Sequence, residues 1–339
     1  MSNYRSRRHG LVAVVAGVAA IGLALTGCAP PSGGDTGSGA GDKIGALYLD
    51  AQGFYGGIKK GIEDGAKTDG LELLGQNSGG DATKEAQFMS TLVSGGVKAI
   101  IMSPVSDTAS VPIVRQAHDA GIPVVCYNTC IEDDAAKEFV YALVTTDQTQ
   151  MGYDVGVIAG NYFKDAGITA PTFGILNCDV YLACVQRKDG FKKAVEEILP
   201  DVQWVADQAG FEPDKSTSTA TTILTATPTL DAFFATTDNG TIGAIQGVIA
   251  SDRKGETVVF GQDISVQLGQ YFVSEPDILI ASNGQDAQAM GREAVKQAIR
   301  AISGEPVENY LTTIPTQMFQ ASDIDAVNEW LTAHADGIP

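Results

Sequence analysis

The chain alternates short apolar runs with segments of helical periodicity from about residue 44 onward. In its first half the apolar runs are IGALYL (44–49), LELLGQN (71–77), VKAIIMSP (97–104), IPVVCYN (122–128) and FVYALVTT (139–146). Between them, apolar residues recur at helical spacing, as in Ile58, Ile62 and Ala66. Runs rich in Val, Ile and Leu that alternate with helices are typical of parallel strands buried on both faces. The pattern therefore predicts a doubly wound α/β lobe.

The same rhythm is repeated in the second half of the chain. Its apolar runs are TFGILNC (172–178), VQWVADQ (202–208), DAFFATT (231–237), ETVVFGQ (256–262) and ILIASN (278–283), with amphipathic stretches near 185–198, 240–251 and 286–301. Two sequential copies of one architecture predict two similar parallel-sheet lobes joined by a hinge.

Polar residues follow the apolar runs in both halves. They are Asp50, Asn77, Ser103, Asn128 and Thr146 in the first half, and Asn177, Gln208, Asp238, Asp263 and Gln285 in the second. Ligands of open parallel sheets bind at the carboxyl ends of the strands. We therefore expect polar groups of both lobes to face a shared cleft. The alternative is that these residues only form turns and helix caps.

The first residues have the features of an export signal. Arg5, Arg7 and Arg8 precede the uncharged run 11–25, which leads into Leu-Thr-Gly-Cys ending at Cys28. This order predicts a signal peptide over residues 1–27, because an uncleaved anchor helix would need about 20 apolar residues. The tetrapeptide resembles the bacterial lipobox, which implies cleavage before Cys28 and lipidation of its thiol. Residues 28–42 are rich in Gly, Ser and Pro and predict a flexible tether.

Composition narrows the possible functions. The 339 residues include 41 acidic and 22 basic side chains, a formal net charge of -19 that disfavours nucleic-acid binding. The three histidines offer little acid–base or metal chemistry, and no dinucleotide, P-loop, nucleophile-elbow or zinc-protease motif is present. Asp238 and Asp263 could form a glycosidase-like pair. We favour a role as acceptors for ligand hydroxyl groups, because no other catalytic group accompanies them. No cofactor or metal is expected.

Four cysteines remain after Cys28, namely Cys126, Cys130, Cys178 and Cys184. An even number in an exported chain predicts two disulfides, for which three connectivities exist. A zinc site is the alternative, although the usual ligand spacings are absent. Pairing between the halves would join the lobes covalently and oppose hinge motion. We therefore predict the local pairs 126 with 130 and 178 with 184.

Several segments together carry a family resemblance. They are Gln52-Gly-Phe-Tyr55, Val97–Pro104 with Asp107, Ala120–Val125 with Tyr127 and Asn128, Arg187–Phe191, Phe233–Ala244 and Val258–Asp263. In this order and spacing the chain resembles the type I family of substrate-binding lipoproteins of ABC importers, which includes ribose-binding protein. The resemblance implies a two-lobed type I periplasmic binding protein fold. Its N-terminal lobe would comprise residues 43–146 and 286–311, and its C-terminal lobe residues 147–285 and 312–339.

The resemblance also implies which residues contact the ligand. They are Gln52, Phe54, Tyr55, Ser103, Asn128, Phe211, Thr237 or Asp238, Asp263 and Gln285, to which we add Asp50 from its strand end. Aromatic rings stack on the C–H faces of sugars, while amides and carboxylates bond to hydroxyl groups. Two arginines of the family's pentose binders are missing, since Asn128-Thr129 and Val185 stand at their positions. Their loss leaves the sugar class open, and Tyr181 is a candidate to replace them in part.

The resemblance implies a monomeric binding protein without enzymatic activity. It would capture a sugar or polyol and deliver it to an ABC permease from the outer face of the cytoplasmic membrane, where its lipid anchor holds it. Three alternatives remain: a module that presents a ligand to a membrane sensor, a secreted glycosidase, and a structural surface protein.

Overall fold

The computed structural model describes residues 41–307 and 309–338. The predicted signal peptide, Cys28 and the tether up to residue 40 lie outside the described residues. Among the residues described, no helix combines the length and the apolar character needed to cross a membrane.

The apolar runs form two six-stranded sheets, as the sequence pattern predicts. Sheet A has the strand order β11-β5-β4-β3-β1-β2 and is parallel throughout. Its strands are β1 (Lys43–Tyr48), β2 (Glu72–Asn77), β3 (Ile100–Met102), β4 (Val124–Tyr127), β5 (Ala142–Thr145) and β11 (Leu311–Thr313).

Sheet B has the order β12-β10-β9-β8-β6-β7, in which only the pairing of β12 with β10 is antiparallel. Its strands are β6 (Thr172–Asn177), β7 (Gln203–Ala209), β8 (Ala232–Ala235), β9 (Val258–Gln262), β10 (Leu279–Gln285) and β12 (Thr316–Gln320).

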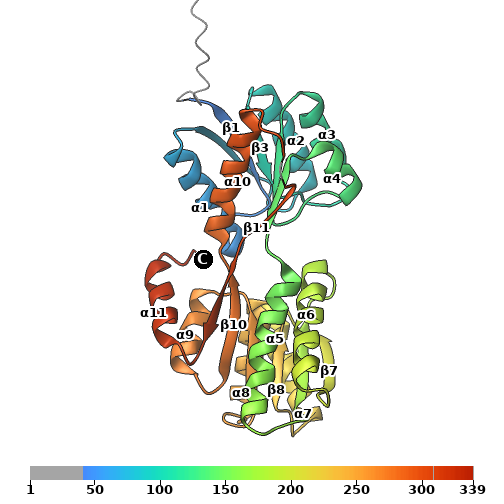
Figure 1. Cartoon of the computed structure of the whole chain (residues 1–339), viewed down its shortest axis with the longest axis vertical. Helices are drawn as coiled ribbons and strands as arrows, with labels where there is room; N and C mark the ends of the chain where they lie inside the picture. The colour runs from blue at the N-terminus through green and yellow to red at the C-terminus, as the bar shows by residue number, and fades with distance from the viewer. Residues whose placement is uncertain (1–40, 308, 339) are drawn as a thin grey trace, which may run out of the picture. The chain divides into compact units, whose positions relative to one another are not determined.

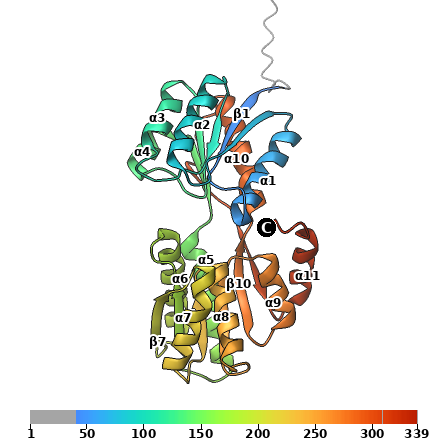
Figure 2. The same cartoon turned by 180° about the vertical axis from the view of Figure 1, so that it is seen from behind.

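Helices cover both faces of each sheet (Figures 1 and 2). Around sheet A these are α1 (Gly53–Thr68) and α10 (Ala287–Ile302) on one face and α2 (Ala82–Ser94), α3 (Val111–Asp119) and α4 (Asp133–Phe139) on the other. Around sheet B, α5 (Gln148–Asp165) and α6 (Leu182–Ile198) lie opposite α7 (Pro213–Ala226), α8 (Asp238–Ala250), α9 (Val266–Ser274) and α11 (Ile324–Ala333). The fold class predicted from sequence is confirmed.

The chain crosses between the two sheets after β5, after β10 and after β11. The expected boundary between residues 311 and 312 falls inside β11 and is corrected by two residues. Thr312 and Thr313 pair with Val144 and Thr145 of β5, so they belong to sheet A. The strand pairing, which no local pattern reports, therefore places the third crossing after Thr313.

Glycines bring α5 and α6 into close contact. A Cβ atom on Gly152 would overlap the backbone oxygen of Arg187, and one on Gly190 would overlap that of Thr149. Helices approach this closely only where a side chain is absent, because the space is filled by backbone. The contact holds Arg187 of α6 beside the first turn of α5.

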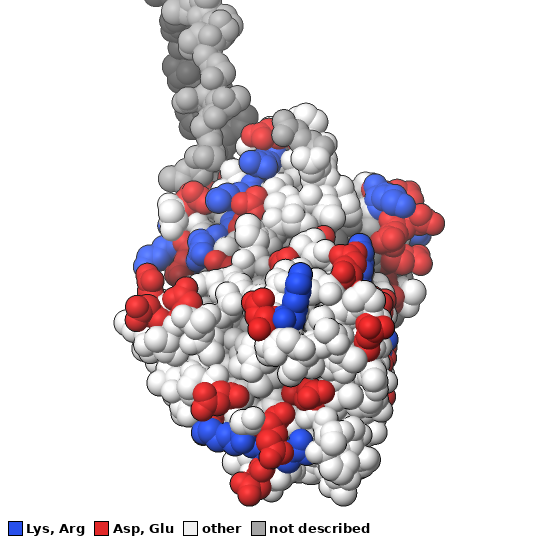
Figure 3. Space-filling view, turned by 60° about the horizontal axis from the view of Figure 1, so that its bottom comes forward, with Lys and Arg blue, Asp and Glu red and all other residues white. Residues whose placement is uncertain are grey.

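Acidic and basic side chains are interspersed on the face of the molecule shown in Figure 3. That face carries no continuous basic surface.

Candidate functional site

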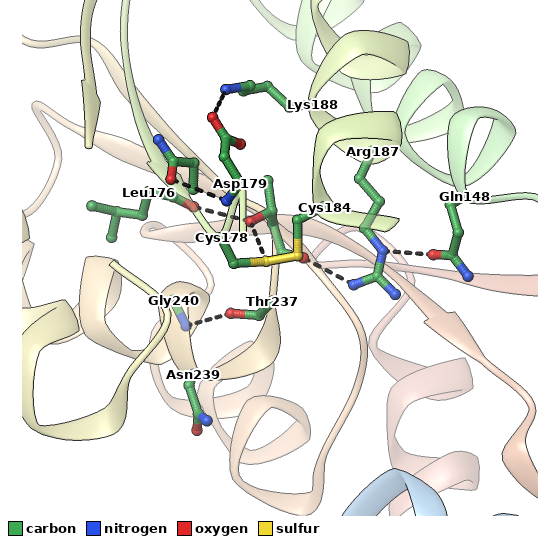
Figure 4. Close-up of a disulfide and its surroundings, with 12 residues drawn as sticks. Gln148, Leu176, Cys178, Asp179, Cys184, Arg187, Lys188, Thr237, Asn239 and Gly240 are labelled. Atoms are coloured by element: carbon green, nitrogen blue, oxygen red, sulfur yellow. Dashed lines mark hydrogen bonds and ion pairs between the residues drawn. A yellow bond between two sulfur atoms is a disulfide. The ribbon is translucent and has the colours of Figure 1, made fainter. Parts of the chain in front are cut away.

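A buried guanidinium organises the carboxyl end of sheet B. Arg187 is 5% exposed, and its Nε donates a hydrogen bond to Oε1 of Gln148 at 2.7 Å (Figure 4). Its Nη1 donates to the backbone oxygen of Thr236 at 2.9 Å and to Oδ2 of Asp263 at 2.8 Å. Fixed acceptors around a buried cation satisfy its charge and hold its plane in one orientation.

Asp263 is placed at the end of β9 by backbone and side-chain bonds. The backbone of Asp263 lies in the left-handed region, with φ 65°. Oδ1 accepts a hydrogen bond from Nε2 of Gln285 at 3.0 Å, while Oδ2 faces Arg187. The side chain remains 24% exposed. Because each carboxylate oxygen can accept more than one hydrogen bond, Asp263 retains capacity to accept further hydrogen bonds.

Asp238 begins α8 and lies close to Asp263. Burial, followed by the charge of Asp263, raises the pKa of Asp238 to about 6, although the backbone of Asn239 and the charge of Arg187 oppose the shift. The preceding residue, Thr237, caps the helix by accepting a hydrogen bond from Gly240 at 3.1 Å. Asp238 can therefore change its protonation state under mildly acidic conditions.

The loop from Cys178 to Cys184 leads from β6 into α6. The structure confirms the predicted disulfide between these residues. Lys188 pairs with Asp179 inside the loop and with Asp207 on the neighbouring strand. The disulfide and the lysine thus restrain the loop, in the region drawn in Figure 4.

Two aromatic side chains lie at this loop. Tyr181 is 59% exposed, and its ring meets the ring of Phe211 edge-on at a centroid distance of 6.0 Å. The contact places these two predicted site residues together.

In the other lobe, Asn128 occupies the end of β4. Its φ is 60°, and the second predicted disulfide, between Cys126 and Cys130, is confirmed on either side of it. The Nδ2 atom of Asn128 donates a hydrogen bond to the Tyr55 hydroxyl at 3.0 Å. Phe54 meets the Tyr55 ring edge-on at 5.6 Å. An amide, a phenol and an aromatic edge are therefore gathered at the carboxyl end of sheet A.

The pKa of the Tyr55 hydroxyl is affected by its burial and by neighbouring polar residues. Burial raises its pKa, hydrogen bonds from Asn128 and Ser103 oppose the shift, and the neighbouring Asp50 and Tyr181 add to it. Asp50 itself is exposed and accepts a hydrogen bond from the backbone of Ala51 at 2.6 Å. Tyr55 thus lies among the predicted site residues Asp50, Ser103 and Asn128 of sheet A.

Two further predicted site residues, Ser103 and Gln52, follow strands β3 and β1 of sheet A. Ser103 is fully buried, with its Oγ 2.9 Å from Oγ1 of Thr129. The loop after it is fixed by buried Glu85, which accepts hydrogen bonds from the Val105 backbone at 2.8 Å and from another residue of that loop. Gln52 is exposed and precedes α1 without capping it through its side chain.

Sequence reasoning missed Gln148 and Thr129, and it treated Arg187 only as part of a helix entry. Arg187 stands in the resembling segment 187–191, which was the available signal. Gln148 offered none, because its role depends on a partner 39 residues away and on another 137 residues away.

The architecture and the site together define a class of protein. Two parallel-sheet lobes present hydrogen-bonding and aromatic side chains at the carboxyl ends of their strands, where open α/β sheets bind ligands. Within the described residues, no group of His, Cys, Asp and Glu side chains is arranged to hold a metal ion. The class is that of two-lobed α/β binding proteins.

Comparison with known proteins identifies the family. Residues 46–306 match the model of the periplasmic binding protein domain, and the chain belongs to this family. It is 34% identical over 298 residues to the ABC transporter periplasmic-binding protein YphF of Escherichia coli, covering 87% of this chain and 90% of the relative. The D-ribose/D-allose-binding protein of Pseudomonas aeruginosa is 27% identical, with 73% and 79% covered.

A solved structure shows the same fold. The periplasmic solute binding protein of Actinobacillus succinogenes with bound D-allose superposes with a TM-score of 0.74 at 23% identity, covering 84% of this chain and 99% of that chain. The fold is therefore the type I periplasmic binding protein fold. The family is one of binding proteins rather than enzymes.

Proposed function

We propose that this protein captures a small polyhydroxylated ligand, a sugar or a polyol, between its lobes and delivers it to an ABC importer. The observation that carries the proposal is the bonding of Asp263 to Arg187 and Gln285 at the end of sheet B. This arrangement holds an ionised acceptor in place before the ligand arrives. Preorganised groups favour affinity because less freedom is lost on binding.

The opposite lobe supplies complementary groups. Asn128 and Tyr55 offer an amide and a hydroxyl, and Phe54 offers an aromatic edge. A ligand that bonds to both lobes binds the closed arrangement more tightly than any arrangement in which the lobes are apart. Such differential affinity shifts the equilibrium between open and closed forms.

The ligand class is supported by chemistry and by relatives. Tyr181 and Phe211 add aromatic surface suited to the C–H face of a sugar ring. The relative from Pseudomonas aeruginosa is named as a D-ribose/D-allose-binding protein, and the solved structure described above holds D-allose. Arg187 supplies one guanidinium to a site that lacks two of the family's arginines, and we therefore leave the particular sugar open.

We propose further that the protein is exported and lipidated at Cys28, and that it acts as a monomer. The tether would let the binding domain reorient near the membrane permease. Metabolic labelling with an alkynyl fatty acid tests the anchor: the wild-type protein should be labelled and Cys28→Ala should not. Labelling of both proteins, or of neither, contradicts the proposal.

The proposed mechanism has no covalent step. Both carboxylate oxygens of Asp263 already accept hydrogen bonds, from Arg187 and Gln285, and we propose that they act as acceptors rather than as a nucleophile. Turnover of aryl glycosides that disappears in Asp238→Asn and Asp263→Asn would instead support the glycosidase alternative.

Ligand screening provides the main test. The purified protein is melted with D-ribose, D-allose, xylitol, myo-inositol, nucleosides and amino acids, since binding to the native state raises its melting temperature. We expect a sugar or a polyol to stabilise the protein, and calorimetry should give one site per chain. Stabilisation by nucleosides or amino acids alone, or by no compound, contradicts the proposal. Stimulation of the permease ATPase by the loaded protein separates transport from presentation to a sensor.

A further inference from the structure

The side chain of Gln148 joins two parts of the site. Gln148 is the first residue of α5, directly after the chain crosses from sheet A. It is 9% exposed, its Oε1 accepts the Nε–H of Arg187 at 2.7 Å, and its Nε2 donates to Oε1 of Gln285 at 3.2 Å. One buried amide thus uses its acceptor on a guanidinium and its donor on a second amide.

Both partners of Gln148 are bonded to Asp263. Arg187 donates to Oδ2 at 2.8 Å, and Gln285 donates to Oδ1 at 3.0 Å. Gln148, Arg187, Asp263 and Gln285 therefore form a closed ring of hydrogen bonds. In this ring the amide of Gln285 must direct Nε2 to Asp263 and Oε1 to Gln148, so the donor of Gln148 selects one of its two flip states.

The ring is also attached to the segments that cross between lobes. Gln148 follows the first crossing, and Gln285 is the last residue of β10, just before the second crossing. Their amide–amide bond therefore links the two crossings at the edge of the ligand site.

We propose that Gln148 is a positioning residue for ligand binding, an inference that rests on the proposed function. Gln148 holds the guanidinium of Arg187 and the amide of Gln285, and these two groups present Asp263 in one orientation. Without the side chain of Gln148, the amide of Gln285 can turn its oxygen toward Asp263, and the Nε–H of Arg187 loses its acceptor. The loss of preorganisation lowers affinity even where the fold is retained.

Two substitutions separate the functions of the amide. Gln148→Leu removes both hydrogen bonds. Gln148→Glu keeps an acceptor for Arg187, with added charge, but has no donor for the oxygen of Gln285. Gln150→Leu is the matched control, because Gln150 lies in the same turn, is exposed and bonds to Asp154 at 2.7 Å.

Affinity is measured by calorimetry with whichever of D-ribose, D-allose, xylitol and myo-inositol binds the wild-type protein most tightly. We expect Gln148→Leu to weaken binding by about tenfold or more, the effect of losing a hydrogen bond to a charged group. Gln148→Glu should weaken binding while its melting temperature stays close to that of wild type, a separation that a merely stabilising residue would not show. Gln150→Leu should change neither quantity.

A double-mutant cycle with Gln285→Leu completes the test. If Gln148 acts through Gln285, the second substitution adds much less than its separate effect. Additive losses, or wild-type affinity in both Gln148 variants, overturn the inference and leave the proposed function intact. A wild-type protein that binds none of the four compounds overturns the proposed function and this inference together.

Discussion

Asn128 and Asp263 occupy corresponding positions in the two lobes. Each follows a central strand, β4 or β9, and each has a left-handed backbone, with φ 60° and 65°. The N–H of Asn128 donates to Val144 and that of Asp263 donates to Asn283, both at 2.8 Å. Their carbonyl oxygens accept hydroxyl hydrogen bonds from the adjoining strand, at 2.8 and 2.6 Å. The two lobes thus hold one amide and one carboxylate by the same device.

Asn128→Gly and Asn128→Ala separate backbone strain from ligand contact. Alanine in the left-handed region costs about 1 kcal/mol more than glycine, so Asn128→Ala should be the less stable of the two in urea unfolding. Both variants lose the amide that faces Tyr55 and should weaken ligand binding alike. Equal stabilities would show that the strand end relaxes, and unchanged affinity in the glycine variant would exclude Asn128 from the ligand contacts.

Asp238→Asn should make stability less dependent on pH. The pKa of Asp238 in the folded protein is about 6, above its ordinary value of 3.8. The folded state therefore binds the proton more tightly than the unfolded chain, and stability is lost as the pH rises from about 4 to about 6.

The neutral amide avoids this loss. Asp238→Asn should exceed wild type by about 2–3 kcal/mol at about pH 7.5 and match it near pH 4 in urea unfolding. A constant difference at both pH values would mean that the carboxyl group does not titrate as described.

Arg187→Met should lower both the stability of the folded protein and its affinity for the ligand. It leaves Asp263 without its cation and Gln148 without its donor, at a cost of about 3 kcal/mol in the free energy of unfolding. Arg187→Lys should have a stability and an affinity between those of wild type and Arg187→Met, because lysine keeps the charge but loses the planar fork. Lys193→Met, at an exposed site on the same helix, is the control. Wild-type affinity in Arg187→Met would show that Arg187 does not contribute to ligand binding.

Gly152→Ala should act on the site through helix packing. Its Cβ would meet the backbone of Arg187, so α6 must shift, at about 1–3 kcal/mol for overpacking. Gly160→Ala on the same helix would crowd the side chain of Ile198, the last residue of α6, which lies well away from Arg187 along that helix. We expect reduced ligand affinity in calorimetry for the first variant and wild-type affinity for the second. The same affinity in both would show that α6 can move without disturbing Arg187.

Tyr181→Ala tests the aromatic rim. Tyr181 is 59% exposed, so its removal should change unfolding by no more than about 0.5 kcal/mol. Affinity for the ligand should fall, because the ring surface beside Phe211 is lost. Val180→Ala, 75% exposed in the same loop, is the matched control. Titrations that do not distinguish the tyrosine variant from wild type would exclude a ligand role for Tyr181.

Local patterns were sufficient for most strands, and the expected division into two lobes was sufficient for the pairing of cysteines. Buried parallel strands require continuous apolar runs, which is why β1 to β10 coincide closely with the runs in the sequence. The short strands β11 and β12 and the helices α4, α5, α7, α9 and α11 were not predicted from the sequence pattern. The end of β11 followed from its pairing with β5 and corrected the expected boundary of the lobes.

The sequence by itself determined the fold class and placed Asn128, Asp263 and Gln285 at strand ends, because burial and turn chemistry act over a few residues. Tertiary structure decided which of these groups meet. Arg187 and Gln148 entered the site because glycine contacts between α5 and α6 bring them within hydrogen-bonding distance. Such contacts depend on the packing of segments far apart in the chain, and no periodicity or spacing along the chain encodes their geometry.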